Sequence, residues 1–370
     1  MMSTIILGSG FTGLAAGIKT GFPIYEASNH AGGICTTYAK DGFQFSNGGP
    51  HFLFGKGVGL DYIKSLVPVN EYERKAGVYY NHIFPYPLQT TAQKVNAVNK
   101  GSLKEWLGNT FSQAECNLFF NPFNEKYTAG LYDQVVQVEE FKSPPAGGVG
   151  FVSTFCDPVN GLTDLVSKMA EKCTINYNHE AIGIDTKEKI VFFKNKHVKY
   201  EKLISTIPLG RLLRLCGREG DFKLPCTSVL VINIGADKAV NTPDEHWLYV
   251  PFCKSGFHRL CFYSNVDKSK APEGKVGMAV EIAYYGDQPD IERVSFEVIK
   301  ELQDWGMIGK VITIDPTIVK VAYTWEYNKG DAKKEIDWLR ERDIISTGRY
   351  GKHKFQGMVD SIKDGFEVEL

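Results

Sequence analysis

Three glycines near the start of the chain have the spacing of a phosphate-binding turn. Gly8, Gly10 and Gly13 follow an apolar run at 4–7 and precede a helix-favouring stretch at 14–18. Gly8 allows a tight turn, Gly10 lets a pyrophosphate approach the backbone, and Gly13 lets helix and strand pack closely. The free N–H groups of the helix N-terminus would bind that pyrophosphate. The motif predicts a dinucleotide-binding βαβ unit.

An acidic residue lies where such a unit needs one. Glu26 follows a second expected strand at 23–25 and can accept hydrogen bonds from a ribose 2′-hydroxyl. The strand, the helix and the acid together favour this interpretation over an ordinary glycine-rich turn.

The turn at 48–51, Gly-Gly-Pro-His, is a second place where chemistry is expected. Its glycines permit close approach of the backbone to a ligand, and His51 is a candidate site residue. The alternative is that His51 packs, half-buried, between Pro50 and Phe52.

Composition limits the classes of function. The 370 residues include 42 basic and 43 acidic side chains, so no electrostatic footprint for nucleic acid or an anionic membrane is present. Eight scattered cysteines show neither Cys-x-x-Cys nor metal-site spacing and are typical of reduced thiols in a cytosolic protein. We expect no metal, no signal peptide, no membrane span and a cytoplasmic location. The oligomeric state is left open.

Hydrophobic periodicity indicates the elements that must position these residues. Helices are expected at 57–71, 91–132 (interrupted by a turn at 121–127), 163–173 and 290–304, with a last helix after Gly348 and Arg349. Strands are expected at 74–89, 174–177, 181–185, 190–193, 200–208, 228–235, 247–250, 259–263, 276–285 and 316–323. Pro144 and Pro145 mark the clearest linker.

The segment after Glu26 adds a resemblance. Glu26 with Gly32 and Gly33 resembles the Glu-x5-Gly-Gly continuation of the flavoproteins in the glutathione reductase and amine oxidase superfamily. The resemblance implies that the dinucleotide is FAD.

Nearly the whole chain is similar to the UDP-galactopyranose mutases, within the amine oxidase and protoporphyrinogen oxidase superfamily. The matching stretches are GSGFTG at 8–13, GGPH at 48–51, FPYPLQ at 84–89, NPFNEKY at 121–127, STIPL at 205–209, HWLYVP at 246–251, FHRLCFYSN at 257–265 and GRYGKHKF at 348–355.

This resemblance implies an α/β fold. A Rossmann-like FAD-binding domain of the glutathione reductase type would carry a helical insertion and an antiparallel β-sheet substrate domain. The expected divisions are 1–70 with 150–225 and 330–370 for FAD, 90–145 for the helical domain, and 71–89 with 226–329 for the substrate domain.

It also implies an unusual isomerase activity on a small-molecule substrate, a sugar nucleotide. N5 of reduced FAD attacks the anomeric carbon, and the resulting flavin–sugar adduct recloses so that pyranose and furanose interconvert. NAD(P)H or another reductant would be a further partner. The alternative is an FAD-dependent oxidoreductase of the amine oxidase or protoporphyrinogen oxidase type, in which N5 accepts hydride.

The resemblance assigns roles to particular residues. His51, Arg259 and Arg349 are the catalytic candidates. The cofactor contacts implied are Gly8, Gly10, Phe11, Thr12, Gly13, Glu26, Ala27, Gly32, Gly33, Gly49, Gly348, Arg349 and Met358. The substrate contacts implied are Tyr86, Gln89, Asn124, Arg259, Asn265, Tyr323 and Phe355.

Several positions depart from the mutase pattern. Cys156 stands where the mutases carry a second phosphate-binding arginine, and Phe355 replaces an active-site tyrosine. Thr324 follows Tyr323 in place of the usual proline, and Tyr263 replaces a phenylalanine. Each missing donor would weaken diphosphate binding by about 1–3 kcal/mol, which keeps the oxidoreductase alternative open.

Overall fold

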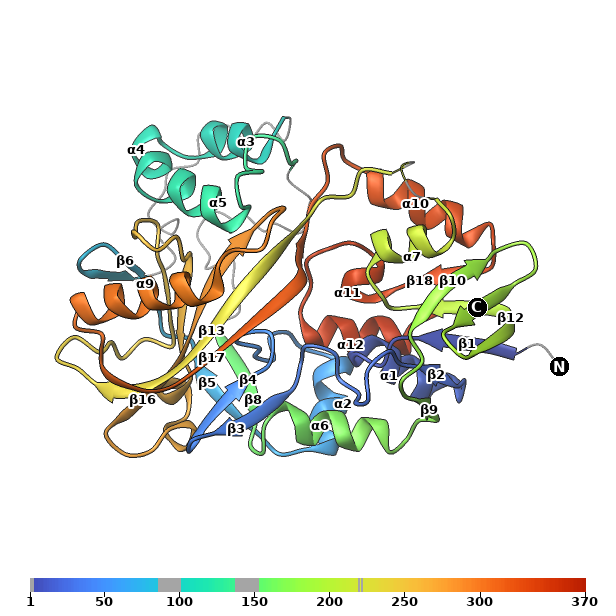
Figure 1. Cartoon of the computed structure of the whole chain (residues 1–370), viewed down its shortest axis with the longest axis horizontal. Helices are drawn as coiled ribbons and strands as arrows, with labels where there is room; N and C mark the ends of the chain where they lie inside the picture. Colours follow the sequence, from blue (N-terminus) through green and yellow to red (C-terminus); the bar gives the residue numbers. More distant parts are fainter. Residues whose placement is uncertain (1–2, 86–100, 137–152, 219, 221) are drawn as a thin grey trace.

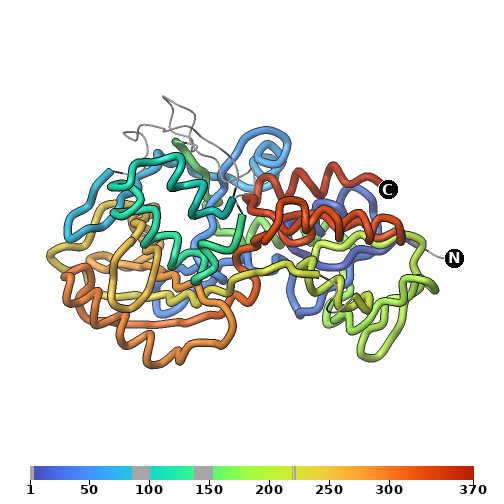
Figure 2. The backbone as a smooth tube through the Cα atoms, turned by 90° about the horizontal axis from the view of Figure 1, so that it is seen from above, coloured from blue at the N-terminus to red at the C-terminus, as the bar shows by residue number. Residues whose placement is uncertain are grey.

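Two seven-stranded sheets organise the part of the chain that the computed structural model describes, namely residues 3–85, 101–136, 153–218, 220 and 222–370. The first sheet has the order β10-β11-β12-β1-β2-β9, with β18 also paired to β12, and the second has the order β17-β13-β16-β15-β14-β6-β7. Each sheet forms the centre of one lobe, and both chain termini lie at the lobe of the first sheet (Figures 1 and 2).

The first sheet contains the βαβ unit expected from the glycine motif. β1 (Ser3–Leu7) leads through α1 (Phe11–Thr20) to β2 (Ile24–Tyr25), and β1 pairs in parallel with both β2 and β12 (Lys196–Ser205). A central parallel strand is covered on both faces, which explains why its sequence is a continuous apolar run.

Helices cover the two faces of this sheet (Figure 1). Ile6 faces the core formed with α1, α2 (Val58–Leu66), α6 (Leu162–Ala170) and α12 (Met358–Phe366). Ile5 and Leu7, on either side of Ile6, point to the opposite face of the sheet, because side chains alternate along a strand. They pack with α7 (Leu209–Leu215) and α10 (Asp331–Arg340).

The second sheet is antiparallel around three long strands, β13 (Cys226–Lys238), β16 (Lys275–Tyr284) and β17 (Ile308–Thr324). One face packs against α9 (Ile291–Asp304), and the other packs against the hairpin β3 (Thr37–Lys40) and β4 (Phe43–Ser46). Beyond β16 the sheet continues, in this order, with β15 (Arg259–Phe262), β14 (Trp247–Tyr249), β6 (Ala76–Tyr79) and β7 (Ile83–Pro85).

A small helical unit packs beside the second sheet (Figure 1). It consists of α3 (Leu103–Thr110), α4 (Gln113–Glu115), η2 (Cys116–Phe120) and α5 (Asn121–Tyr127). Its aromatic core also includes Val78 of β6 and Trp325, so the unit is attached to the sheet through apolar contact.

The remaining elements are short, and β9, β10, β11 and β18 among them belong to the first sheet. They are β5 (Val69–Glu73), β8 (Thr154–Pro158), β9 (Ile175–Asn176), β10 (Ala181–Asp185), β11 (Ile190–Phe193), α8 (Tyr263–Val266), η3 (Lys268–Lys270), β18 (Ile344–Ser346) and α11 (Gly348–Gly351). No helix among the described residues is long and apolar enough to cross a membrane.

The predicted α/β fold class is confirmed, whereas some predicted elements were wrong. The segment 121–127 is α5 and not a turn, because Pro122 lies in the first helical turn, where its missing N–H costs little. The helix predicted to run to 71 ends at Leu66, since Val67 precedes a proline and is extended. The strand predicted from 316 begins at 308, because an edge strand tolerates a proline within it.

The helices at 209–215 and 331–340 were missed. The linker prolines and the helical residues expected at 91–100 lie outside the described residues. The domain boundaries expected from the sequence stay a prediction.

Close packing of the β3–β4 hairpin on β13 leads to a first prediction. A Cβ added at Gly235 would lie 2.5 Å from the Phe43 ring, whereas one added at Gly277 would lie 3.4 Å from the same ring. Overpacking of this kind costs about 1–3 kcal/mol. We expect Gly235→Ala to lower the free energy of unfolding in urea by about that amount, and the control Gly277→Ala to change it by less. Equal stability of the two variants would contradict this packing.

Candidate functional site

The glycine turn leaves room for a ligand at the N-terminus of α1. Gly8 has φ +92°, and a Cβ at Gly13 would lie 1.9 Å from the carbonyl oxygen of Gly8, so both positions require glycine. A Cβ at Gly10, the N-cap of α1, would meet nothing within 4 Å. Since no side chain caps the helix, its first N–H groups stay available to an anion. The turn therefore fits a dinucleotide pyrophosphate.

Glu26 lies at the end of β2, next to that turn. Its Oε2 accepts hydrogen bonds from the Ser9 backbone N–H (2.8 Å) and hydroxyl (2.7 Å), and its Oε1 accepts them from the same two groups of Ser28 (2.9 and 2.8 Å). These bonds hold the carboxylate in place. A ribose hydroxyl would bind by replacing one of the two serine hydroxyls.

The other predicted cofactor residues surround the same turn. The Gly32 N–H donates to the Ser9 carbonyl at 2.9 Å, and a Cβ at Gly33 would lie 4.0 Å from the Gly10 Cα. Phe11 and Thr12 are buried in α1, Met358 is buried at the start of α12, and Ala27 is exposed.

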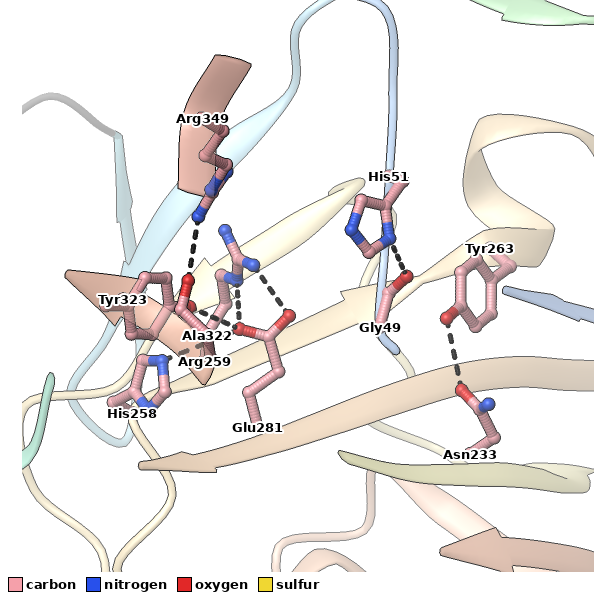
Figure 3. Close-up of polar contacts among 10 residues, drawn as sticks. All are labelled: Gly49, His51, Asn233, His258, Arg259, Tyr263, Glu281, Ala322, Tyr323 and Arg349. Carbon is pink, nitrogen blue, oxygen red and sulfur yellow. Dashed lines mark hydrogen bonds and ion pairs between the residues drawn. The ribbon is translucent and has the colours of Figure 1, made fainter. Parts of the chain in front are cut away.

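A buried ion pair forms the centre of a second cluster, on the antiparallel sheet. Arg259 of β15 and Glu281 of β16 are cross-strand partners. Arg259 donates from Nε to Oε2 (2.8 Å) and from Nη2 to Oε1 (2.6 Å), a bidentate contact (Figure 3). The Glu281 side chain is 5% exposed and that of Arg259 is 30% exposed. The hydroxyl of Tyr323 also donates to Oε2, at 3.3 Å.

His51 belongs to the same cluster. Its Nδ1 donates to the Gly49 carbonyl at 2.6 Å, and a Cβ at Gly49 would lie 3.2 Å from Glu281 Oε1. The pKa of His51 is lowered from 6.5 to about 4. Burial is the largest cause, the charges of Arg349 and Arg259 act in the same direction, and the Gly49 bond and Glu281 oppose them. The imidazole is therefore neutral near pH 7, with Nε2 as an acceptor.

α11 joins the two clusters. A Cβ at Gly348 would lie 2.4 Å from the hydroxyl oxygen of Thr12, so the start of α11 packs on the start of α1. The next residue, Arg349, points toward the ion pair and donates to the carbonyl of Ala322 at 3.0 Å (Figure 3). It also donates to the carbonyl of Gln356 at 3.0 Å. Its guanidinium also lies 4.8 Å from the centre of the Phe355 ring.

The side chains of two other predicted substrate residues, Asn265 and Asn124, donate hydrogen bonds to backbone carbonyls. Asn265 donates to the Pro243 and Glu245 carbonyls (2.7 and 2.8 Å). Asn124 is buried in α5; its Nδ2 donates to the Phe120 carbonyl at 2.8 Å, and its Oδ1 has no partner among the described residues. Tyr86 and Gln89 lie outside the described residues.

The position of Cys156 explains one departure from the mutase pattern. Cys156 is 3% exposed on β8, forms a β-bridge with Leu53 and belongs to the core around α1. The thiol at this position is a packing residue and presents no positive charge to a ligand.

Two residues of the cluster, Glu281 and His258, were not predicted. The signal for Glu281 was an acidic residue within the otherwise apolar strand 276–283, where a carboxylate needs a buried partner. His258 lies next to Arg259 in the stretch 257–265, but no sequence signal gives it a role, and its burial follows from the fold.

Comparison with known proteins places the fold. No family model and no curated protein matches the chain. A reduced UDP-galactopyranose mutase has the same fold, with a TM-score of 0.87 and 22% identity over 99% of this chain and 93% of that one. An Exiguobacterium sp. 255-15 protein assigned as a protoporphyrinogen oxidase has a TM-score of 0.80 and 14% identity over 99% and 97%.

A putrescine oxidase bound to putrescine is also similar, with a TM-score of 0.70 and 13% identity over 99% of this chain and 97% of that one. The chain thus has the fold that these mutase and oxidase structures share, as the sequence resemblance predicted.

The glycine turn gives a prediction that separates folding from binding. Gly13→Ala places a methyl group against the Gly8 carbonyl and should lower the unfolding temperature, with loss of bound flavin. Gly10→Ala, which has open space and an ordinary φ of −67°, should keep the unfolding temperature of the flavin-free protein and lose flavin affinity. Flavin absorbance of the purified variants and thermal unfolding of the apoproteins measure this; unchanged flavin affinity in Gly10→Ala would contradict it.

The ion pair predicts a dependence of stability on pH. Burial by itself would raise the pKa of Glu281, but Arg259, together with the neighbouring His258, outweighs this and lowers it from 4.5 to about 2. The stabilisation, on the order of 3 kcal/mol, is complete above about pH 4.5 and is lost as the pH falls toward 2. In Glu281→Gln we expect lower stability at neutral pH and a shallower decline below pH 4.5, measured by urea unfolding at each pH. If the free energy of unfolding falls equally with pH in the wild type and in Glu281→Gln, this role of the ion pair is contradicted.

Proposed function

We propose that the chain binds FAD and is a flavoenzyme. The support is the open backbone at Gly10, the uncapped N-terminus of α1 and the fixed carboxylate of Glu26. Bound FAD in its reduced state would supply a nucleophilic N5 for group transfer or, in its oxidised state, a hydride acceptor.

We further propose sugar-nucleotide mutase activity of the UDP-galactopyranose mutase kind. The observation that carries this proposal is the single polar cluster of Arg259, Tyr323, His51 and Arg349, which α11 links to the dinucleotide turn. Guanidinium and phenol donors placed beside a flavin site suit a diphosphate leaving group.

Each group in the cluster has a defined capacity. Arg259 uses Nε and one Nη2 hydrogen on Glu281, which leaves its other N–H groups for phosphate oxygens. Neutral His51 presents Nε2 as an acceptor for a hydroxyl proton. Arg349 is held on two carbonyls and contributes a fixed positive charge to the cluster.

A second candidate is an oxidoreductase of the amine oxidase or protoporphyrinogen oxidase type. One observation favours it directly: Glu281 cancels the charge of Arg259, so the ion pair offers no net attraction to a diphosphate. Cys156 and Phe355 also lack the donors that the mutases have at these positions.

The two activities are distinguished by their products. The protein, with FAD reduced by dithionite, is incubated with UDP-galactose and other sugar nucleotides, and furanose products are sought by chromatography. Formation of furanose supports the mutase. If no sugar nucleotide is converted and peroxide forms in the presence of an amine or a porphyrinogen, the mutase proposal is rejected in favour of the oxidoreductase. NAD(P)H in place of dithionite tests the reductant.

Arg259 gives the mutational test. Arg259→Lys keeps a positive charge beside Glu281 but loses the bidentate geometry, so we expect weaker sugar-nucleotide binding by about 1–3 kcal/mol and an unchanged flavin spectrum. Arg293→Lys on the exposed face of α9 is the matched control. Loss of flavin from Arg259→Lys would show instead that Arg259 is structural.

A further inference from the structure

His258 is a buried histidine that the proposed function does not use. Its side chain is 1% exposed and lies against the aromatic rings of Phe123, Tyr127 and Tyr323, at ring-centre distances of 6.1, 5.5 and 6.2 Å. Neither ring nitrogen has a hydrogen-bond partner among the described residues. Buried polar groups in proteins are almost always hydrogen-bonded, so this imidazole requires an explanation.

The nearest polar group is the carboxylate that holds Arg259. Nε2 of His258 lies 3.5 Å from Oε2 of Glu281, longer than an ordinary N–H···O bond. The same oxygen accepts from Nε of Arg259 at 2.8 Å. The carboxylate of Glu281 therefore lies between two side chains, hydrogen-bonded to Arg259 and in a longer contact of 3.5 Å with His258 (Figure 3).

We propose that His258 is a positioning residue that hydrogen-bonds to the Glu281 carboxylate when an anionic group of the substrate displaces this carboxylate from the guanidinium of Arg259. The identity of that anion as a diphosphate rests on the proposed function. A small movement of Oε2 toward Nε2 satisfies the imidazole and frees the charge of Arg259 for the ligand. A proton taken up from solvent by His258 then keeps Glu281 paired with a cation.

The surrounding charges determine when the proton is bound. The groups that face His258 are Glu281, Arg259, Lys126 and Tyr127 of α5, and Tyr323. Burial lowers the pKa of His258. The charges of Arg259 and Lys126 also lower it, whereas Glu281 raises it. Approach of the carboxylate therefore raises the pKa, and anion binding should be accompanied by proton uptake. Affinity should then increase as the pH falls, by at most about tenfold per pH unit.

A titration without ligand tests the movement directly. The pKa of His258 is measured by NMR in the flavin-loaded wild type, Glu281→Gln, Arg259→Met and the double variant, with His258→Gln used for assignment. If Glu281 moves to His258 once Arg259 is absent, Glu281→Gln lowers that pKa by more in the Arg259→Met background than in the wild type.

An equal effect of Glu281→Gln in the two backgrounds would overturn the proposal, because fixed charges contribute additively. Arg349→Met is the matched control: Arg349 is bonded to the Ala322 and Gln356 carbonyls, so the effect of Glu281→Gln in its background should equal that in the wild type. His51 is an internal probe, since its pKa should rise when either arginine is removed.

Calorimetry with UDP tests the linkage to binding. Titrations in buffers of different ionisation enthalpy should show proton uptake in the wild type and none in His258→Gln, which keeps a hydrogen-bond donor but does not titrate. Binding of UDP with the same proton uptake in both proteins would overturn the role of His258. Failure of UDP to bind the wild type would contradict the proposed function, while the ligand-free titration still decides the role of His258.

Discussion

The cross-strand pairing of Arg259 with Glu281 is the interaction on which the candidate site depends. Two charged groups leave water together only if each finds its partner in good geometry, and the β15–β16 register provides this through a bidentate contact. Once the carboxylate is buried there, a Cβ at Gly49 would crowd it at 3.2 Å, Tyr323 donates to it, and Nε2 of His258 lies 3.5 Å from it. A surface arginine on an unpaired strand would have none of these neighbours.

The same pair also determines how the site responds to a ligand. Because Glu281 neutralises Arg259, an anion must compete with a carboxylate that is already in place. The free-energy cost of that competition is lower if the displaced carboxylate finds another donor, and the buried imidazole of His258 is the group placed to act as one. In the proposed site, the discrimination between diphosphate and uncharged substrates would thus depend on His258, the residue next to Arg259 in the stretch 257–265.

The dinucleotide half of the molecule is built from local rules. Gly13 is required because a Cβ there would lie against the Gly8 carbonyl, and Glu26 is held by Ser9 of the glycine turn and by Ser28 two residues on. All these residues belong to one short βαβ segment, so its glycine spacing and the position of Glu26 could be read from the sequence, whereas the two serine contacts were not predicted. Errors in the helix and strand limits occurred at prolines. The proline in the segment 121–127 lies in a first helical turn and the one in β17 lies on an edge strand, where each is tolerated, whereas the helix predicted to run to 71 ends just before Pro68.

The sequence by itself determined the βαβ unit, because that unit rests on a short motif with fixed spacing. Its resemblance to a flavoprotein family, carried by short matching stretches, implied the α/β class and the candidacy of Arg259, His51 and Arg349. Only the tertiary structure decided that Glu281 neutralises Arg259, that Asn265 binds backbone carbonyls instead, and that Cys156 is core. The reason is physical: partners such as Arg259 and Glu281 meet through strand register between segments separated in the chain, and a single sequence does not contain that register.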